Sequence, residues 1–243
     1  MKDRQGRVPR LFVEAGLQPH SRFELPEGAA HHAARVLRLR EGDAVVLFDG
    51  CGGEYDARLA MPGRDRVVAE TGERRDPQRE SPLEVTLLQG VSSSERMDFT
   101  IQKAVELGVA AIQPVLSGKS VVRLSGEREA KKLAHWRRIA IAACEQSGRN
   151  RIPEVREPVS LDRYRAPAGT KILLSPAGAQ KLSNLAQGPL VLAAGPEAGF
   201  SPEEEQLLER AGFAPVRLGP RILRTETAAL AALAALNALA GDF

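Results

Sequence analysis

The chain has 243 residues, of which 43% are hydrophobic and 27% are charged, a balance typical of a globular protein and not of a disordered one. Its 34 Lys and Arg residues against 31 Asp and Glu give a net charge of +3. Cys51 and Cys144 are the only cysteines, and no CxxC pair is present, which argues against a disulfide framework and a structural zinc site. We therefore expect one large or two small domains with an ordinary core.

The ends of the sequence carry no targeting or membrane signal. The stretch from Met1 to Arg10 has no apolar segment, and the longest apolar run, Ala228–Ala240, is too short to span a bilayer. The sequence thus predicts a cytoplasmic protein with no membrane association and no bound metal.

The first 75 residues have short apolar runs separated by turn residues. This pattern is typical of a small β-barrel or sandwich. A short helix is expected at His31–Leu39, and strands are expected at Ala44–Phe48, Glu54–Ala60 and Arg66–Ala69. A polar stretch with Pro77 and Pro82 follows, which predicts a linker over residues 76–82 between a domain at 1–75 and a second one at 83–243.

From residue 83 onward, strand and helix patterns alternate, which predicts an α/β domain with a mainly parallel sheet. Ser92 and Glu95 form a capping-box pattern, and Ser201, Pro202 and Glu204 form another. The expected strands are Leu83–Gly90, Ala111–Leu116, Lys171–Leu174, Leu190–Ala194 and Pro215–Leu218. The expected helices run from Ser92 to Leu107, over Ala130–Gln146, from Ser201 onward and over Thr225–Ala240.

Two loops that follow strands are candidates for ligand binding. The sequence has neither a P-loop nor a GxGxxG dinucleotide motif, which argues against a nucleotide hydrolase and a Rossmann-type site. Gly195 and Gly199 flank Glu197 in the first loop, and Arg, Thr and Glu side chains crowd the second loop over residues 218–229. Taken singly, the sequence of each loop favours a tight connection between a strand and a helix with no bound ligand. Two such loops in one domain favour a ligand site at the strand ends.

Residues 81–165 form the basic part of the chain, with 14 basic and 10 acidic side chains. Arg149 and Arg151 follow the predicted helix, where either dipole stabilisation or function explains them equally well. Lys103 and Glu106 have the spacing of an ordinary surface ion pair, and Lys119 and Arg123 fit a solvated loop. This excess of charge is compatible with nucleic-acid binding but does not establish it.

Four motifs together resemble one family. GPEAGFSPEE at 195–204, LGPRILRTETAA at 218–229, EQSGR at 145–149 and QKAVELGV at 102–109 resemble the bacterial 16S rRNA uridine-N3 methyltransferases of the SPOUT (trefoil-knot) class. The segment from Arg10, with Arg35 and Arg38, resembles the PUA-like RNA-binding domain of that family. Two departures are visible, namely Ala198 in place of the usual Gly and Val105 in place of a common Thr. If position 198 needs a positive φ, its Cβ costs about 1 kcal/mol.

The resemblance implies methylation of uridine 1498 of 16S rRNA in the 30S subunit, with S-adenosyl-L-methionine as cofactor, by a homodimeric SPOUT fold preceded by a small β-barrel. It also implies which residues hold the cofactor. These are Leu174, Ser175, Pro176, Gly195, Pro196, Glu197, Gly199, Leu218, Gly219, Ile222, Leu223, Arg224, Thr225, Thr227 and Ala228.

The chemistry of N3 methylation requires a group that stabilises negative charge on uracil and one that accepts its imide proton. Arg149, Arg224 and Arg123 are candidates for the first role, and Glu145 or Glu226 for the second. We expect Glu226 mainly to orient Arg224. The residues expected to contact RNA are Arg35, Arg38, Lys103, Lys119, Arg123 and Arg149.

Two other functions remain open from the sequence. One is a non-catalytic RNA-binding or ribosome-assembly factor, and the other is a knot methyltransferase that acts on a different RNA. The intact EQSGR and RILRTETA motifs favour an enzyme, because a protein that only binds RNA needs no cofactor loop.

Overall fold

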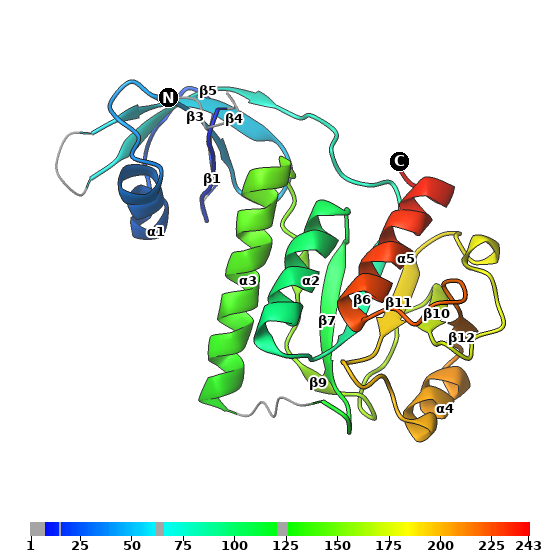
Figure 1. Cartoon of the computed structure of the whole chain (residues 1–243). Helices are drawn as coiled ribbons and strands as arrows, with labels where there is room; N and C mark the ends of the chain where they lie inside the picture. The colour runs from blue at the N-terminus through cyan, green and yellow to red at the C-terminus, as the bar shows by residue number, and fades with distance from the viewer. Residues whose placement is uncertain (1–7, 15, 62–65, 121–125) are drawn as a thin grey trace. The chain divides into compact units, whose positions relative to one another are not determined.

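The computed structural model describes residues 8–14, 16–61, 66–120 and 126–243. The chain divides into two compact units (Figure 1). Unit 1 comprises Met1–Glu80 and Cys144–Ile152, and unit 2 comprises Ser81–Ala143 and Pro153–Phe243. The division at Glu80 falls inside the predicted linker, 76–82. The predicted domains differ from these units at Cys144–Ile152, because a sequence-based boundary cannot show that a later segment returns to the first unit.

Unit 1 is built on a five-stranded sheet with the order β1-β3-β4-β5-β2. Only β1 and β3 pair in parallel; the other neighbours are antiparallel. Alternating residues of β4 are buried, as expected for a strand with one face on the core. Its elements are β1 (Arg10–Phe12), β2 (Arg22–Glu24), α1 (Glu27–His31), the π-helical turn η1 (His32–Val36), β3 (Ala44–Phe48), β4 (Glu54–Ala60) and β5 (Val68–Arg75).

Unit 2 contains a sheet with the order β12-β10-β11-β6-β7-β8, in which every pair is parallel and β9 also pairs with β7. All residues of β6 and β11 are buried, which explains their continuous apolar sequences. The strands are β6 (Val85–Gly90), β7 (Ala111–Leu116), β8 (Glu154–Val155), β9 (Val159–Ser160), β10 (Thr170–Leu174), β11 (Leu190–Ala194) and β12 (Ala214–Val216).

Helix α5 packs against α2 and contacts β6 and β11 (Figure 1). Its buried residues include Ala229, Ala232, Leu233 and Leu236, which form one stripe at helical spacing. Asn237 lies within this stripe, and both polar atoms of its side chain are hydrogen-bonded, since Oδ1 accepts from Ser81 Oγ at 2.8 Å and Nδ2 donates to the Leu107 carbonyl at 2.8 Å. The helices are α2 (Ser94–Glu106), α3 (Glu127–Ser147), the 3-10 turn η2 (Leu182–Asn184), α4 (Pro202–Arg210) and α5 (Thr225–Ala240).

Several predicted elements have the expected bounds. Strands Ala44–Phe48, Glu54–Ala60, Ala111–Leu116 and Leu190–Ala194 and helix Thr225–Ala240 are confirmed. The capping box at Ser201 and Glu204 is also formed, with hydrogen bonds in both directions. These features rest on local signals, namely continuous or alternating apolar runs and a helix start with its own cap.

Other predictions need correction. The helix expected at His31–Leu39 begins at Glu27, after Pro26, and the strand expected at Arg66–Ala69 runs from Val68 to Arg75. Strands β1 and β2 were not predicted, because each has only three residues and depends on pairing with β3 or β5. The capping box at Ser92 is wrong. Ser93 occupies the cap position of α2, and its side chain makes no capping hydrogen bond.

A buried carboxylate organises the polar part of unit 1. The Glu54 side chain is 1% exposed and is paired with Arg10, with Arg79 at 2.8 Å and with Arg75 at 3.1 Å. Burial alone would raise the pKa of Glu54. The hydrogen bonds from Arg79 and Arg10 outweigh that effect and lower the pKa from 4.5 to about 2. The carboxylate therefore remains charged throughout the physiological range.

We expect Glu54→Gln to reduce the free energy of unfolding at pH 7 by about 3 kcal/mol, since it removes the charged partner of Arg10, whose side chain is only 11% exposed. The folded-state pKa is lowered, so this stabilisation is complete above pH 4.5 and is lost as the pH falls toward 2. Denaturant unfolding from pH 7 to pH 2 measures the difference between variant and wild type. Glu73→Gln, at a side chain that is 81% exposed, is the control. A gap that stays constant at all pH values would contradict this account.

Candidate active site

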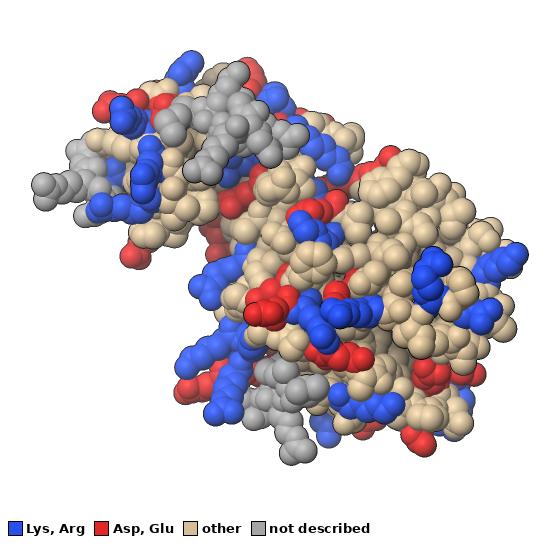
Figure 2. All heavy atoms as spheres, in the orientation of Figure 1, with Lys and Arg blue, Asp and Glu red and all other residues tan. Residues whose placement is uncertain are grey.

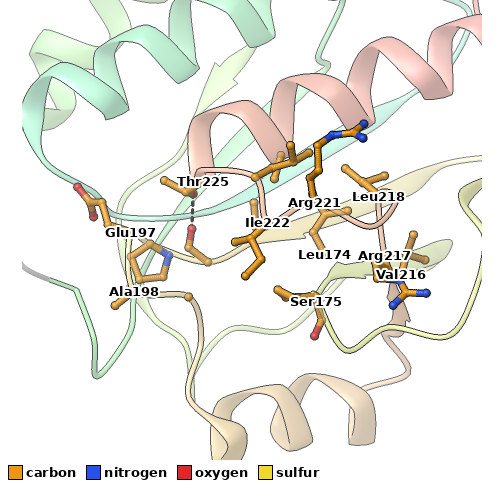
Figure 3. A pocket seen from close by; sticks show the side chains of 17 residues that line it. Leu174, Ser175, Glu197, Ala198, Val216, Arg217, Leu218, Arg221, Ile222 and Thr225 are labelled. Atoms are coloured by element: carbon orange, nitrogen blue, oxygen red, sulfur yellow. Dashed lines mark hydrogen bonds between the residues drawn. The ribbon is translucent and has the colours of Figure 1, made fainter.

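Three loops of unit 2 surround one pocket. They follow β10, β11 and β12, which are neighbours in the parallel sheet, so their carboxyl ends meet at the same edge. The pocket has a volume of about 250 Å³ (Figure 3). Its lining residues are Leu174, Ser175, Pro176, Ala194, Gly195, Pro196, Glu197, Ala198, Gly199, Val216, Arg217, Leu218, Arg221, Ile222, Leu223, Thr225 and Ala228.

The structure brings most of the predicted cofactor residues to this pocket. Gly219, Arg224 and Thr227 are the exceptions, since none of them lines it. Five residues outside the prediction do line it, namely Ala194, Ala198, Val216, Arg217 and Arg221. A side chain at such a loop faces the cavity or solvent depending on the loop's path, which strand and helix patterns do not specify.

The loop after β12 leaves backbone donors free beside the pocket. Among the described residues, the N–H groups of Leu218, Ile222 and Leu223 donate to no protein acceptor. Unpaired backbone donors and acceptors next to an apolar cavity are what a heteroaromatic ligand with donors and acceptors on its edge requires. Ile222 is 85% exposed, although it is a large apolar residue that lines the pocket. The loop is thus suited to hold an apolar ring system.

A polar contact joins two of the loops at the base of the pocket. The Thr225 hydroxyl donates to the Gly195 carbonyl, as the dashed line in Figure 3 marks. Gln89, at the end of β6, is completely buried and donates through Nε2 to Thr225 Oγ1 at 3.1 Å and to the Gly195 carbonyl at 3.4 Å. These bonds fix the start of α5 against the loop that follows β11.

Two predicted cofactor residues direct their polar atoms elsewhere. The Ser175 hydroxyl donates to Glu205 of α4 at 3.2 Å. The Glu197 carboxylate points away from the other labelled side chains (Figure 3) and accepts from the Ser93 N–H at 2.7 Å. Burial raises the pKa of Glu197, but the hydrogen bond from Ser93 and the charge of Arg96 outweigh it and lower that pKa. Glu197 therefore anchors its loop at the start of α2 as an ionised carboxylate.

The two glycines of the 195–199 loop are required for different reasons, one steric and one conformational. A Cβ on Gly195 would lie 2.7 Å from the Phe200 backbone nitrogen, and Gly199 has a φ of +68°. Among the described residues other than glycine, positive φ occurs only at His20 and Arg38. The strain considered for Ala198 is therefore absent, because the left-handed conformation falls on Gly199.

Of the catalytic candidates, Arg224 and Glu226 lie at the start of α5. Arg224 occupies the cap position and is exposed. The expected pairing of Glu226 with Arg224 is not found. The basic group recorded near Glu226 is instead Arg96 of α2, whose Nε lies 3.9 Å from Glu226 Oε1. This contact joins residues 130 positions apart and has no local sequence signal.

Arg149 and Glu145 belong to unit 1, where both are engaged. Arg149 is 6% exposed and donates to Glu80 Oε2 through Nη2 at 2.6 Å and Nε at 2.8 Å. Glu145 accepts from the Phe12 N–H at 3.0 Å, and burial raises its pKa. The first and last residues of the EQSGR motif are thus held by hydrogen bonds and an ion pair of unit 1, and neither residue lines the pocket.

The predicted RNA contacts lie in several places. Arg35 and Arg38 are exposed in unit 1. Lys103 forms the expected ion pair with Glu106 at 2.8 Å, and Lys119 donates to the Phe200 carbonyl at 3.3 Å. Arg123 lies outside the described residues.

No group of His, Cys, Asp and Glu side chains suited to a metal ion occurs in the described ranges. Within the same ranges, no helix combines the length and the apolar character needed to cross a bilayer.

Comparison with known proteins assigns the family. A model described as an RNA methyltransferase domain matches residues 79–237, and an RNA methyltransferase PUA domain matches 25–71. The chain belongs to the RNA methyltransferase family. The fold is accordingly that of the SPOUT class, with a small PUA-like β-domain in front.

Relatives of this RNA methyltransferase extend over nearly its whole length. The ribosomal RNA small subunit methyltransferase E of Buchnera aphidicola is 32% identical, covering 98% of this chain and 96% of the relative. Two solved structures are similar over 98% of this chain and 100% of theirs. A methyltransferase of Legionella pneumophila with bound SAM has 41% identity and a TM-score of 0.94. The ribosomal RNA small subunit methyltransferase E of Neisseria gonorrhoeae bound to S-adenosyl methionine has 44% identity and a TM-score of 0.91.

Two residues at the site of this RNA methyltransferase were missed by the sequence analysis. In the sequence pattern, Gln89 is a polar residue near the end of an apolar strand, and Arg96 is one of several charged residues on an amphipathic helix. A buried glutamine at a strand's carboxyl end is a usable signal in a parallel sheet, since that edge carries the ligand site. Arg96 has no comparable signal.

We expect Gly195→Ala to destabilise the protein by about 1–3 kcal/mol, because the added Cβ meets backbone atoms that cannot rotate away. Thermal and denaturant unfolding measure the change. Gly16→Ala is the matched control, since nothing lies within 4 Å of its Cβ position. Equal stability of the two variants would show that the loop adapts freely to a side chain at position 195.

Proposed function

We propose that this protein transfers a methyl group from S-adenosylmethionine to N3 of uridine 1498 in 16S rRNA. The observation that carries the proposal is the pocket with free backbone donors at Leu218, Ile222 and Leu223. Support comes from the relatives named ribosomal RNA small subunit methyltransferase E and from similar structures that hold S-adenosyl methionine. We further propose that the target is presented by the 30S subunit in the cytoplasm.

The three loops would hold the cofactor, which supplies an activated methyl group when bound. Backbone groups at Leu218, Ile222, Leu223 and Thr227 are proposed to bond the adenine edge. Leu174, Pro176 and Pro196 add apolar surface from the other two loops. Gly195 and Gly199 allow the backbone of the middle loop to turn close to the ligand.

N3 of uracil lies on the Watson–Crick edge and carries a proton, so the base must be unpaired before it can react. We propose Arg224 as the group that stabilises negative charge on the uracil oxygens, because it is exposed at the start of α5 beside the pocket loop. Arg123 remains a candidate from the sequence. Arg149 is committed to Glu80, and Glu145 to the Phe12 N–H, so we give both a structural role in unit 1.

RNA binding requires positive charge that contacts phosphate. In unit 2, Lys and Arg side chains gather along α3 (Figure 2). Arg128, Lys131, Arg137 and Arg138 of that helix are exposed. With Lys103 and Lys119 they form our proposed phosphate-binding surface of unit 2, and Arg35 and Arg38 form that of unit 1. We also propose a homodimer, to which the exposed apolar side chains of Phe99, Ile222 and Leu239 are suited.

Methyl transfer to 30S subunits that lack native modifications tests the function. We expect label from S-adenosylmethionine on N3 of uridine 1498 and on no other nucleotide. Naked 16S rRNA serves as the second substrate and shows whether the assembled particle is needed. Label on another RNA would replace the proposed target. Cofactor binding without any transfer would favour a ribosome-assembly factor.

We expect Glu226→Gln to lower the rate of methyl transfer while leaving the shape of the pH–rate profile unchanged, because Glu226 faces Arg96 and acts as a positioning group. Single-turnover rates from pH 6 to pH 9 measure this, with the exposed Glu209→Gln as control. Loss of one ionisation from the profile would instead identify Glu226 as the group that accepts the imide proton.

A further inference from the structure

Arg96 lies between the two loops that enclose most of the pocket. Its Nη1 is 3.5 Å from Glu197 Oε1, in the loop after β11, and its Nε is 3.9 Å from Glu226 Oε1, in the first turn of α5. Arg96 itself belongs to the first turn of α2. One guanidinium therefore faces a carboxylate of the loop after β11 and a carboxylate at the start of α5.

These ion pairs are longer than hydrogen bonds, which for N–H···O contacts peak near 2.9–3.0 Å. Each carboxylate also keeps a buried oxygen, Glu197 Oε2 and Glu226 Oε2, with no hydrogen-bond partner among the described residues. Unpaired buried oxygens on charged groups are costly. The cluster of Arg96, Glu197 and Glu226 therefore makes fewer hydrogen bonds than its donors and acceptors allow, although groups of opposite charge face each other.

The two halves of the cluster are held unequally. Glu197 is also anchored by the Ser93 N–H at 2.7 Å. Glu226 has no hydrogen bond from another described residue at its Oε2, and its ion pair with Arg96 is the longer one. A small movement of the α5 start toward α2 would shorten that pair. The same movement would carry the 217–225 loop, which precedes α5, toward the loop that contains Glu197.

We propose that Arg96 is a positioning residue that closes the 217–225 loop against the 194–199 loop when S-adenosylmethionine binds. This inference rests on the proposed function. Cofactor in the pocket contacts both loops, so its binding favours the arrangement in which Arg96 bonds both carboxylates. Part of the cofactor affinity is then supplied by contacts that the cofactor does not make itself. The planar guanidinium holds five N–H donors in a fixed fork that can bond both carboxylates, whereas a lysine offers three donors at a single point.

The test measures cofactor binding by isothermal titration calorimetry with the full chain. Arg96→Met is expected to weaken binding of S-adenosylmethionine about tenfold, and Glu226→Gln to weaken it comparably. The double variant is expected to bind no more weakly than Arg96→Met alone, because the Arg96–Glu226 contact that Glu226→Gln removes is already lost in Arg96→Met. Arg96→Lys is expected to recover part of the affinity. Arg210→Met, at an exposed arginine in the last turn of α4, is the control.

Steady-state kinetics separate positioning from a general structural loss. The KM for S-adenosylmethionine should rise in the Arg96→Met variant, while the KM for 30S subunits and the unfolding temperature stay at their wild-type values. A rise confined to the KM for 30S subunits would overturn the inference and make Arg96 an RNA contact. If Arg96→Met fails to fold, Glu226→Gln decides, and wild-type cofactor affinity in that variant overturns the inference. If the wild-type chain binds no cofactor, the proposed function itself fails.

Discussion

Parallel pairing of β12, β10 and β11 is the constraint on which the candidate site depends. Parallel neighbours end at the same edge of a sheet, so the loops after Leu174, Ala194 and Val216 must emerge side by side. None of these loops forms the pocket alone, since residues of all three line it. The position of the site follows from the strand order, and the identity of the loop residues then decides which ligand fits.

When three loops pack together, their polar groups leave water and need hydrogen-bond partners within the protein. Gln89 and Thr225 provide one set by bonding the Gly195 carbonyl from two different elements. Glu197 provides another, because its carboxylate accepts from the Ser93 N–H at the start of α2. The hydrogen bond from Ser93 and the charge of Arg96 together keep the half-buried Glu197 carboxylate ionised. The same residues that shape the pocket thereby also join the loops to the sheet and to α2.

The EQSGR segment shows why chemistry-bearing residue types do not by themselves locate a site. Arginine and glutamate at the end of a helix are compatible with catalysis and also with a network of ion pairs. In unit 1, Glu80 receives Arg149 through two nitrogen donors, and its other oxygen accepts the N–H groups of Asn150 and Arg151 at 3.2 Å. The neighbouring Glu54 is held ionised by its arginines. This part of the motif therefore organises the fold of unit 1.

The sequence by itself determined the elements whose cause is local. The apolar run Leu190–Ala194, the capping box at Ser201 and the small-residue helix Thr225–Ala240 carry their signals within a few residues. The motifs at 195–204 and 218–229 also located most of the pocket lining. Only the tertiary structure decided that β1 and β2 form strands, that Glu197 reaches Ser93, and that Arg96 rather than Arg224 faces Glu226. Each of these features depends on a residue far away in the sequence. Periodicity and motif spacing report only interactions between residues that are close in the sequence.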